Sequence, residues 1–165
     1  MAKDSSFDVV SRVDMNLVTE SVHVALKEIG NRYDFRGTDS AIDLDAKALV
    51  LTLRSSDEYK VKALFDVLTT RMAKRGLPLK NFTPQKFEEA LGGTVRQKVT
   101  ITQGVPTEKA RAIVAAVKKA GIKVQVAIQG DQVRVSGRSK DLLQEAISLL
   151  KEKDFGLALQ FENYR

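Results

Sequence analysis

The sequence contains no cysteine and no tryptophan, and only one histidine and three prolines among its 165 residues. Without cysteine there can be no disulfide, no thiolate metal site and no thiol nucleophile, and this composition is typical of a reducing compartment. The longest apolar runs span a few residues, and residues 1–6 lack the apolar stretch of a signal peptide. We therefore expect a cytoplasmic protein with no membrane segment.

Motifs that mark common active sites are also missing. Neither GxGxxG nor GxxxxGK occurs, which excludes the usual Rossmann and P-loop phosphate cradles. The single histidine, His23, falls beside the apolar stripe of a predicted helix, with no nucleophile or orienting acid evident next to it. Asp43 and Asp45 share one face of a predicted strand, which suits a metal or an acid–base pair but equally a solvated hairpin end. We expect no enzyme, no cofactor and no metal site.

Charge is distributed unevenly along the chain. There are 27 basic and 21 acidic residues, which gives a net charge of +6. Residues 1–90 carry 14 basic and 14 acidic side chains, so the whole excess lies in residues 91–165. A basic half favours an anionic partner such as nucleic acid, and a merely solvated basic surface is an equal alternative.

The pattern of apolar residues predicts alternating strands and helices in residues 1–90. The predicted strands cover residues 7–13, 33–36, 41–45, 48–54 and 80–82. One helix begins after Asp14 and ends at Gly30, and a second begins with a capping box of Ser55 and Glu58. The polar stretch after Pro84 is interpreted as a connector.

Residues 91–165 repeat this order as βαββαβ. Strands are predicted over residues 94–103, 122–128, 132–136 and 157–161, with helices that begin at Pro106 and Ser139. Aligning residues 51–55 with 135–139 indicates an internal duplication at a spacing of about 80 to 90 residues. The predicted fold class is α+β, with tandem duplicated ferredoxin-like two-layer sandwiches as domains 1–90 and 91–165.

A ferredoxin-like sheet leaves one face open, and the residues limit what that face can bind. The central strands lack aromatic residues, which disfavours base stacking of the RNA-recognition-motif type. Residues 137–140 precede a predicted helix, where a phosphate site and an ordinary Ser139 cap are both consistent with the sequence. Arginines and glutamines fall on or beside the predicted strands and could use hydrogen bonds and charge: Arg12, Arg36, Gln97, Gln125, Gln129, Arg134 and Arg165.

Four separated blocks resemble the YajQ family of small bacterial nucleotide-binding proteins over essentially the full length. They are residues 6–11, residues 32–37, residues 129–131 with Arg134 and Val135, and residues 159–165. The resemblance implies that the N-terminal strands of the two domains are exchanged, so that strand 7–13 completes the second sheet and strand 94–103 the first. It also implies binding of guanine nucleotides, of transfer RNA and, in some members, of a cyclic guanine dinucleotide in transcription-linked signalling.

Residues and resemblance together leave two functions open. The first is a non-enzymatic nucleotide-binding protein for a guanine nucleotide or cyclic dinucleotide, with a signalling role. The second is a module that binds transfer RNA or a transcription regulator. Arginines suit phosphate and guanine and glutamines suit base edges, near the sheets and the interdomain cleft. The predicted ligand-binding residues are Arg36, Gln97, Gln129, Arg134, Arg138 and Arg165.

Overall fold

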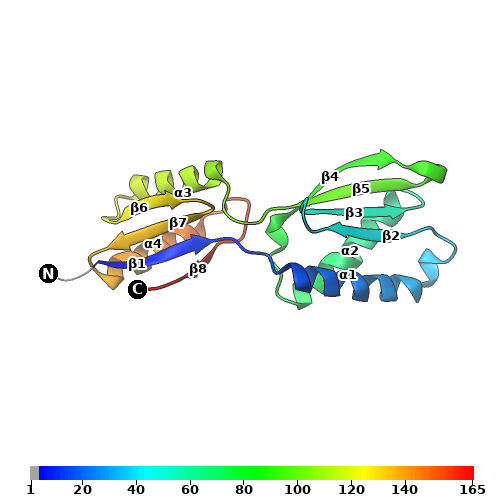
Figure 1. Cartoon of the computed structure of the whole chain (residues 1–165), viewed down its shortest axis with the longest axis horizontal. Helices are drawn as coiled ribbons and strands as arrows, with labels where there is room; N and C mark the ends of the chain where they lie inside the picture. The colour runs from blue at the N-terminus through cyan, green and yellow to red at the C-terminus, as the bar shows by residue number, and fades with distance from the viewer. Residues whose placement is uncertain (1–3) are drawn as a thin grey trace. The chain divides into compact units, whose positions relative to one another are not determined.

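The computed structural model describes residues 4–165, so the first three of the residues 1–6 discussed above lie outside it. The described chain contains eight strands and four α-helices (Figure 1). The strands are β1 Ser5–Val10, β2 Ala41–Asp45, β3 Val50–Ser55, β4 Phe82–Glu89, β5 Val95–Ile101, β6 Gln125–Gln129, β7 Gln132–Gly137 and β8 Gln160–Glu162. The helices are α1 Met15–Gly30, α2 Glu58–Lys74, α3 Thr107–Ala120 and α4 Lys140–Glu152. None of these helices is long and apolar enough to cross a membrane.

The strands form two antiparallel sheets of four strands each. One sheet has the order β6-β7-β1-β8 and the other has the order β2-β3-β5-β4. The first strand of the chain therefore lies between β7 and β8, and β5 lies between β3 and β4. Four antiparallel strands with two helices in each sheet are compatible with a two-domain ferredoxin-like arrangement. Duplication and exchange themselves stay predictions.

Contacts divide the chain into two units. One unit combines the segment that ends at Arg12 with Gln103–Arg165, and the other is Val13–Thr102. We call them the β1–β8 unit and the β2–β5 unit. Helices α3 and α4 pack against the first sheet, and α1 and α2 against the second. The sequence predicts domains 1–90 and 91–165, and this division stays a prediction.

Local sequence signals account for most helix ends. The Asp14 carboxylate accepts a hydrogen bond from the Asn16 amide at 3.0 Å, as an N-cap does, and Ser139 does the same for Leu142 at 3.2 Å. Helix α2 differs from the predicted capping box. Its cap is Asp57, which accepts from the Lys60 amide at 2.8 Å, because the Ser55 side chain is fully buried and bonds elsewhere.

Two further predictions about the β2–β5 unit are wrong. Residues 33–36 are not a strand: Tyr33–Phe35 form a 3₁₀ turn, in which aromatic and polar residues alternate by coincidence. Residues after Pro84 are not a connector, because β4 continues to Glu89. This strand lies at the sheet edge and most of its side chains are exposed, so its polar sequence imitates a loop.

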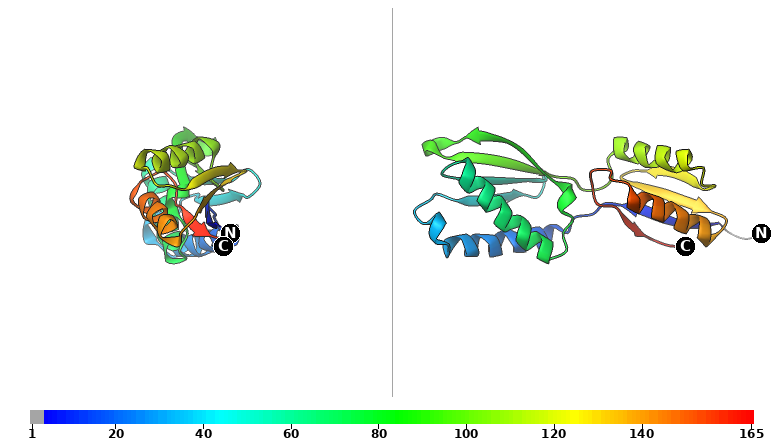
Figure 2. Two further views of the ribbon diagram at one scale, coloured as in Figure 1. Left: turned by 90° about the vertical axis from the view of Figure 1, so that its left-hand side faces the viewer. Right: turned by 180° about the vertical axis from the view of Figure 1, so that it is seen from behind.

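Alternation of side chains gives each sheet one covered and one open face. In the β1–β8 unit, Phe7 pairs with Val135 and Val9 with Val133, and all four side chains are fully buried. Figures 1 and 2 show the sheet from opposite sides, with α4 behind β1 in the first and in front of it in the second (right). Side chains between these buried positions point away from the helices.

Candidate functional site

We call the side of the β6-β7-β1-β8 sheet that faces away from α3 and α4 the open face. Strand register places one set of positions on this side, because residues paired directly across neighbouring strands point the same way. Apart from Val10 and Ala127, the set is polar. Its polar members are Ser6, Asp8, Gln125, Gln129, Gln132, Arg134, Ser136, Gln160 and Glu162.

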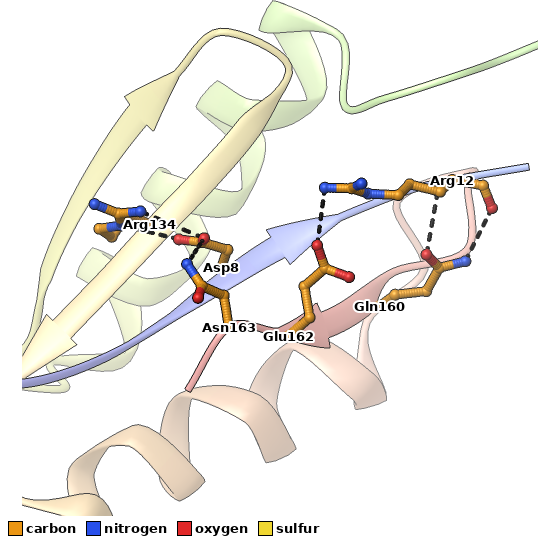
Figure 3. A network of polar contacts seen from close by, with 6 residues as sticks. All are labelled: Asp8, Arg12, Arg134, Gln160, Glu162 and Asn163. Atoms are coloured by element: carbon orange, nitrogen blue, oxygen red, sulfur yellow. Dashed lines mark hydrogen bonds and ion pairs between the residues drawn. The ribbon is translucent and has the colours of Figure 1, made fainter. Parts of the chain in front are cut away.

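An ion pair between Asp8 and Arg134 lies at the centre of the open face (Figure 3). Arg134 donates from Nε to Asp8 Oδ1 at 2.9 Å and from Nη2 to Oδ2 at 3.4 Å. Asn163 adds a third donor, from Nδ2 to Oδ2 at 2.8 Å. The Arg134 hydrogen bond lowers the pKa of Asp8 below its ordinary value, although burial of the carboxyl acts in the opposite direction.

The two partners differ in their access to water. The Asp8 side chain is 4% exposed, whereas the Arg134 side chain is 34% exposed. A guanidinium carries five N–H groups, and Asp8 engages one on Nε and one on Nη2. Within residues 4–165 the other three N–H donors of Arg134 have no acceptor, and Asp8 holds the orientation of the group that carries them.

Along β8 and just after β1, the polar groups of the open face bind one another. Arg12 pairs with Glu162 at 2.8 Å, from Nη2 to Oε1. The Gln160 amide accepts from the Arg12 backbone N–H at 3.2 Å and donates to its carbonyl at 3.0 Å (Figure 3). These side chains are engaged with one another, so the donors for a ligand lie toward β6 and β7.

Four of the six predicted site residues lie in the β1–β8 unit. Arg134 and Gln129 belong to the open face, and Arg138 follows directly after β7 and is exposed. Arg165 exchanges two backbone hydrogen bonds with Ser6, at 3.0 and 3.1 Å, which carries the chain on beside β1 after β8.

The other two predicted residues, Gln97 and Arg36, lie in the β2–β5 unit. Gln97 is paired with Leu53 on the helix-covered side of its sheet and is 7% exposed. Its Nε2 donates to the Gln85 carbonyl at 2.8 Å, at the irregularity in β4. Arg36 follows the 3₁₀ turn and is exposed. Neither residue belongs to the open face, which is formed by strands of the β1–β8 unit.

Asp8 and Asn163 were not among the ligand-binding residues predicted from the sequence, although a sequence pattern points to Asp8. Asp8 is a lone acid between Phe7 and Val9 in an alternating strand, which places its side chain opposite two buried ones. Asn163 has a positive φ of 58°, a backbone conformation that no pattern in the sequence announces.

Two hollows adjoin the open face. One, of about 310 Å³, is lined by Gln125 and Ser136 of the face together with Lys123, Arg138 and Asp4, among others. The second, of about 290 Å³, shares Ser6 with the open face, but much of its lining belongs to α4 on the covered side, including Leu143 and Ile147. Its cations are Lys140 and Arg165, and its aromatic ring is Tyr164. Positive charge therefore accompanies the hydrogen-bonding groups at the edge of the face.

The residues considered for catalysis or metal binding belong to the other unit. His23 is exposed on α1, and Asp43 and Asp45 are exposed on β2, all in the β2–β5 unit. Within residues 4–165, no group of three or more histidine or acidic side chains is placed to hold a metal ion.

Comparison with known proteins gives a consistent result. A family model described as "Nucleotide-binding protein YajQ-like" matches residues 5–165. A protein of Elusimicrobium minutum named nucleotide-binding protein is 57% identical over 162 residues, which cover 98% of this chain and 99% of that protein. Relatives of the same name in Koribacter versatilis and Carboxydothermus hydrogenoformans are 49% and 48% identical, over 98% and 100% of both chains. None of these names indicates a catalytic activity.

Proposed function

The chain belongs to the YajQ-like nucleotide-binding protein family, and from this premise we propose that it binds a nucleotide without changing it chemically. We assign the ligand to the open face of the β1–β8 unit. The observation that carries this assignment is the Arg134 guanidinium, which Asp8 holds in place while three of its donors stay available. A donor group held in position loses less conformational entropy when a ligand binds.

Guanine is the base that suits this arrangement. An arginine fork donates to two acceptors, and guanine offers the pair O6 and N7, whereas adenine offers N7 beside an amino donor. Gln129 and Gln132 pair with each other at the β6–β7 turn, next to the pair of Ala127 and Arg134, and supply amides for the base edge. Lys123 and Arg138, at the neighbouring hollow, supply charge for phosphate.

A ligand with two guanines can use the same arginine, amides and cations as a mononucleotide. A cyclic guanine dinucleotide therefore remains within the proposal, and with it a role in signalling. The resemblance also implies a transcription-linked partner protein, and that partner stays a prediction.

The test is calorimetric titration of the full chain with GMP, GTP and a cyclic guanine dinucleotide, with AMP as the comparison. Arg134→Lys is the informative variant, because lysine keeps the charge opposite Asp8 and removes the fork. We expect affinity for the best guanine ligand to fall by about 1.5–3 kcal/mol, with little effect on AMP.

Arg111→Lys is the matched control. Arg111 is exposed on α3, on the other side of the sheet, and has no ion-pair partner in residues 4–165. The Arg111→Lys variant should bind guanine ligands with the affinity of the wild type. If Arg134→Lys also binds guanine ligands normally, Arg134 does not contact the nucleotide and the assignment to the open face is wrong.

RNA is the second candidate ligand, and one observation favours it. Exposed cations without an ion-pair partner in the described chain lie in the last turn of α3 and in the segment after it: Lys118, Lys119 and Lys123. A polyanion held by several such residues loses affinity steeply with salt, whereas a mononucleotide does so weakly. A shallow log–log salt dependence for transfer RNA would count against this function.

A further inference from the structure

The block of residues 32–37, one of the family-like motifs, lies in the β2–β5 unit and takes no part in the open face. It contains the 3₁₀ turn Tyr33–Phe35, which follows α1, and then Gly37 with a φ of +76°. This left-handed conformation favours glycine and turns the chain toward β2. The segment borders a pocket of its own, which raises the question of what it binds.

Electrostatic contacts hold the motif in one shape. Arg32 donates two hydrogen bonds to the Asp34 carboxylate, from Nε to Oδ1 at 2.9 Å and from Nη2 to Oδ2 at 2.7 Å. Lys60 donates to the Asp34 carbonyl, and its Nζ and the Arg32 Cζ each lie 5.3 Å from the centre of the Phe35 ring. Phe35 is 4% exposed, so the ring forms a buried base beneath two cations.

A chain of hydroxyls fixes the loop after the motif, and its direction follows from counting protons. Thr38 donates its only hydroxyl proton to the Phe35 carbonyl at 2.6 Å. Ser40 must therefore donate to Thr38, and Ser55 to Ser40, at 2.8 Å in each case. All three protons are used, so these hydroxyls offer a ligand lone pairs only. Any donor must come from another group.

The donors at this pocket are arginines. The pocket has a volume of about 300 Å³ and an apolar floor that includes Leu26, Ile29 and Phe35. Its charged lining residues are Arg32 and Arg36, and none of its lining residues is acidic. Arg36 is exposed, and its backbone N–H donates to the Tyr33 carbonyl at 3.1 Å. Within residues 4–165 its side chain has no hydrogen-bond or ion-pair partner, and the Gly37 amide has none either. Asp34, the nearest acid in the motif, is already occupied by Arg32.

We infer that this pocket, named here the Arg36 pocket, binds the phosphate group of a small phosphorylated molecule. Arg36 is the principal contact, Arg32 presents the N–H groups that Asp34 leaves over, and the apolar floor takes the carbon part of the ligand. Two guanidinium groups with no acid lining the pocket favour a phosphate, which accepts paired hydrogen bonds from each. The pocket belongs to the β2–β5 unit, its lining shares no residue with the open face, and the inference does not depend on the proposed function.

The experiment is a titration of the isotope-labelled full chain with inorganic phosphate, followed by amide NMR, with acetate as a second arm. Saturable shifts of the amides of Arg36, Gly37 and Thr38 are expected. Arg36→Gln should weaken phosphate binding at this site at least about tenfold, which corresponds to loss of one charge-assisted contact. Stronger binding of acetate than of phosphate would overturn the assignment to phosphate.

Two controls keep the result interpretable. Arg111→Gln removes the same charge from an exposed helix and should leave the shifts at Gly37 unchanged. Arg134→Lys alters the open face only, so normal phosphate binding in this variant separates the Arg36 pocket from the proposed nucleotide site. The inference is wrong if the shifts fail to saturate, or if Arg36→Gln and Arg111→Gln respond to phosphate alike. An unchanged spectrum outside the pocket shows that Arg36→Gln is folded.

Discussion

Removing Arg134 should destabilise the β1–β8 unit more than removing its partner, because the two groups are unequally buried. In Arg134→Ala the Asp8 carboxylate, which is 4% exposed in the wild type, is left with Asn163 as its remaining side-chain donor. In Asp8→Asn the guanidinium loses its partner but reaches water, since it is one-third exposed. The same ion pair therefore gives two different costs, depending on which half is deleted.

The magnitude follows from the carboxylate that is left behind. An under-satisfied buried charged acceptor costs about 2–3 kcal/mol, and in a unit of this size each kcal/mol lowers Tm by about 4–8 °C. Asp8→Asn should cost clearly less. The double variant should be more stable than Arg134→Ala alone, because it no longer buries an unpaired charge.

The cost of Arg134→Ala should also depend on pH. In the wild type Arg134 lowers the pKa of Asp8, so this group stabilises the fold above its unfolded pKa and stops doing so as pH falls through its folded pKa. In Arg134→Ala the largest cause of that lowering is gone, and burial raises the pKa of Asp8 relative to the wild type. Protonation then relieves the variant, so the two melting temperatures should converge below about pH 4.

Thermal unfolding of the wild type, both single variants and the double variant, measured by calorimetry from about pH 3 to pH 7, tests these expectations. Amide NMR of β1 and β7 at each pH identifies which unit unfolds. The reasoning is refuted if the two single variants lose equal stability, or if the gap between wild type and Arg134→Ala is the same at every pH.

Three further changes test the fold. Deleting residues 1–10 removes the strand between β7 and β8, so hydrogen exchange should accelerate in Gln103–Arg165 and not in Val13–Thr102; the reverse would contradict the pairing of β1. Gln97→Ala removes the donor to a β4 carbonyl and should cost about 1 kcal/mol in urea unfolding, whereas Gln129→Ala should cost nothing measurable. Asp57→Ala should lower stability by about 1 kcal/mol, and Ser139→Ala by a similar amount, because each side chain caps a helix; no change in either would mean that the cap is dispensable.

Local patterns were sufficient for much of the secondary structure and for one feature of the site. Helix α3 ends at Gly121 with a φ of 71°, a conformation that glycine adopts without strain, so the position of this glycine accounts for the helix end. The alternation of Val133, Arg134 and Val135 likewise accounts for the burial of both valines and for an arginine that faces away from the helices. These features depend on neighbours within a few residues.

What surrounds those side chains was decided by tertiary structure. Alternation places Arg134 on a face but cannot say which strand lies beside it, and its partner Asp8 is 126 residues earlier. Gln97 has a side chain suited to binding a base edge. Its pairing with Leu53 nevertheless turns it to the covered side, where its amide donates to a β4 carbonyl. A strand's sequence determines the period of its side chains, whereas its neighbours and its register depend on how distant apolar faces pack together.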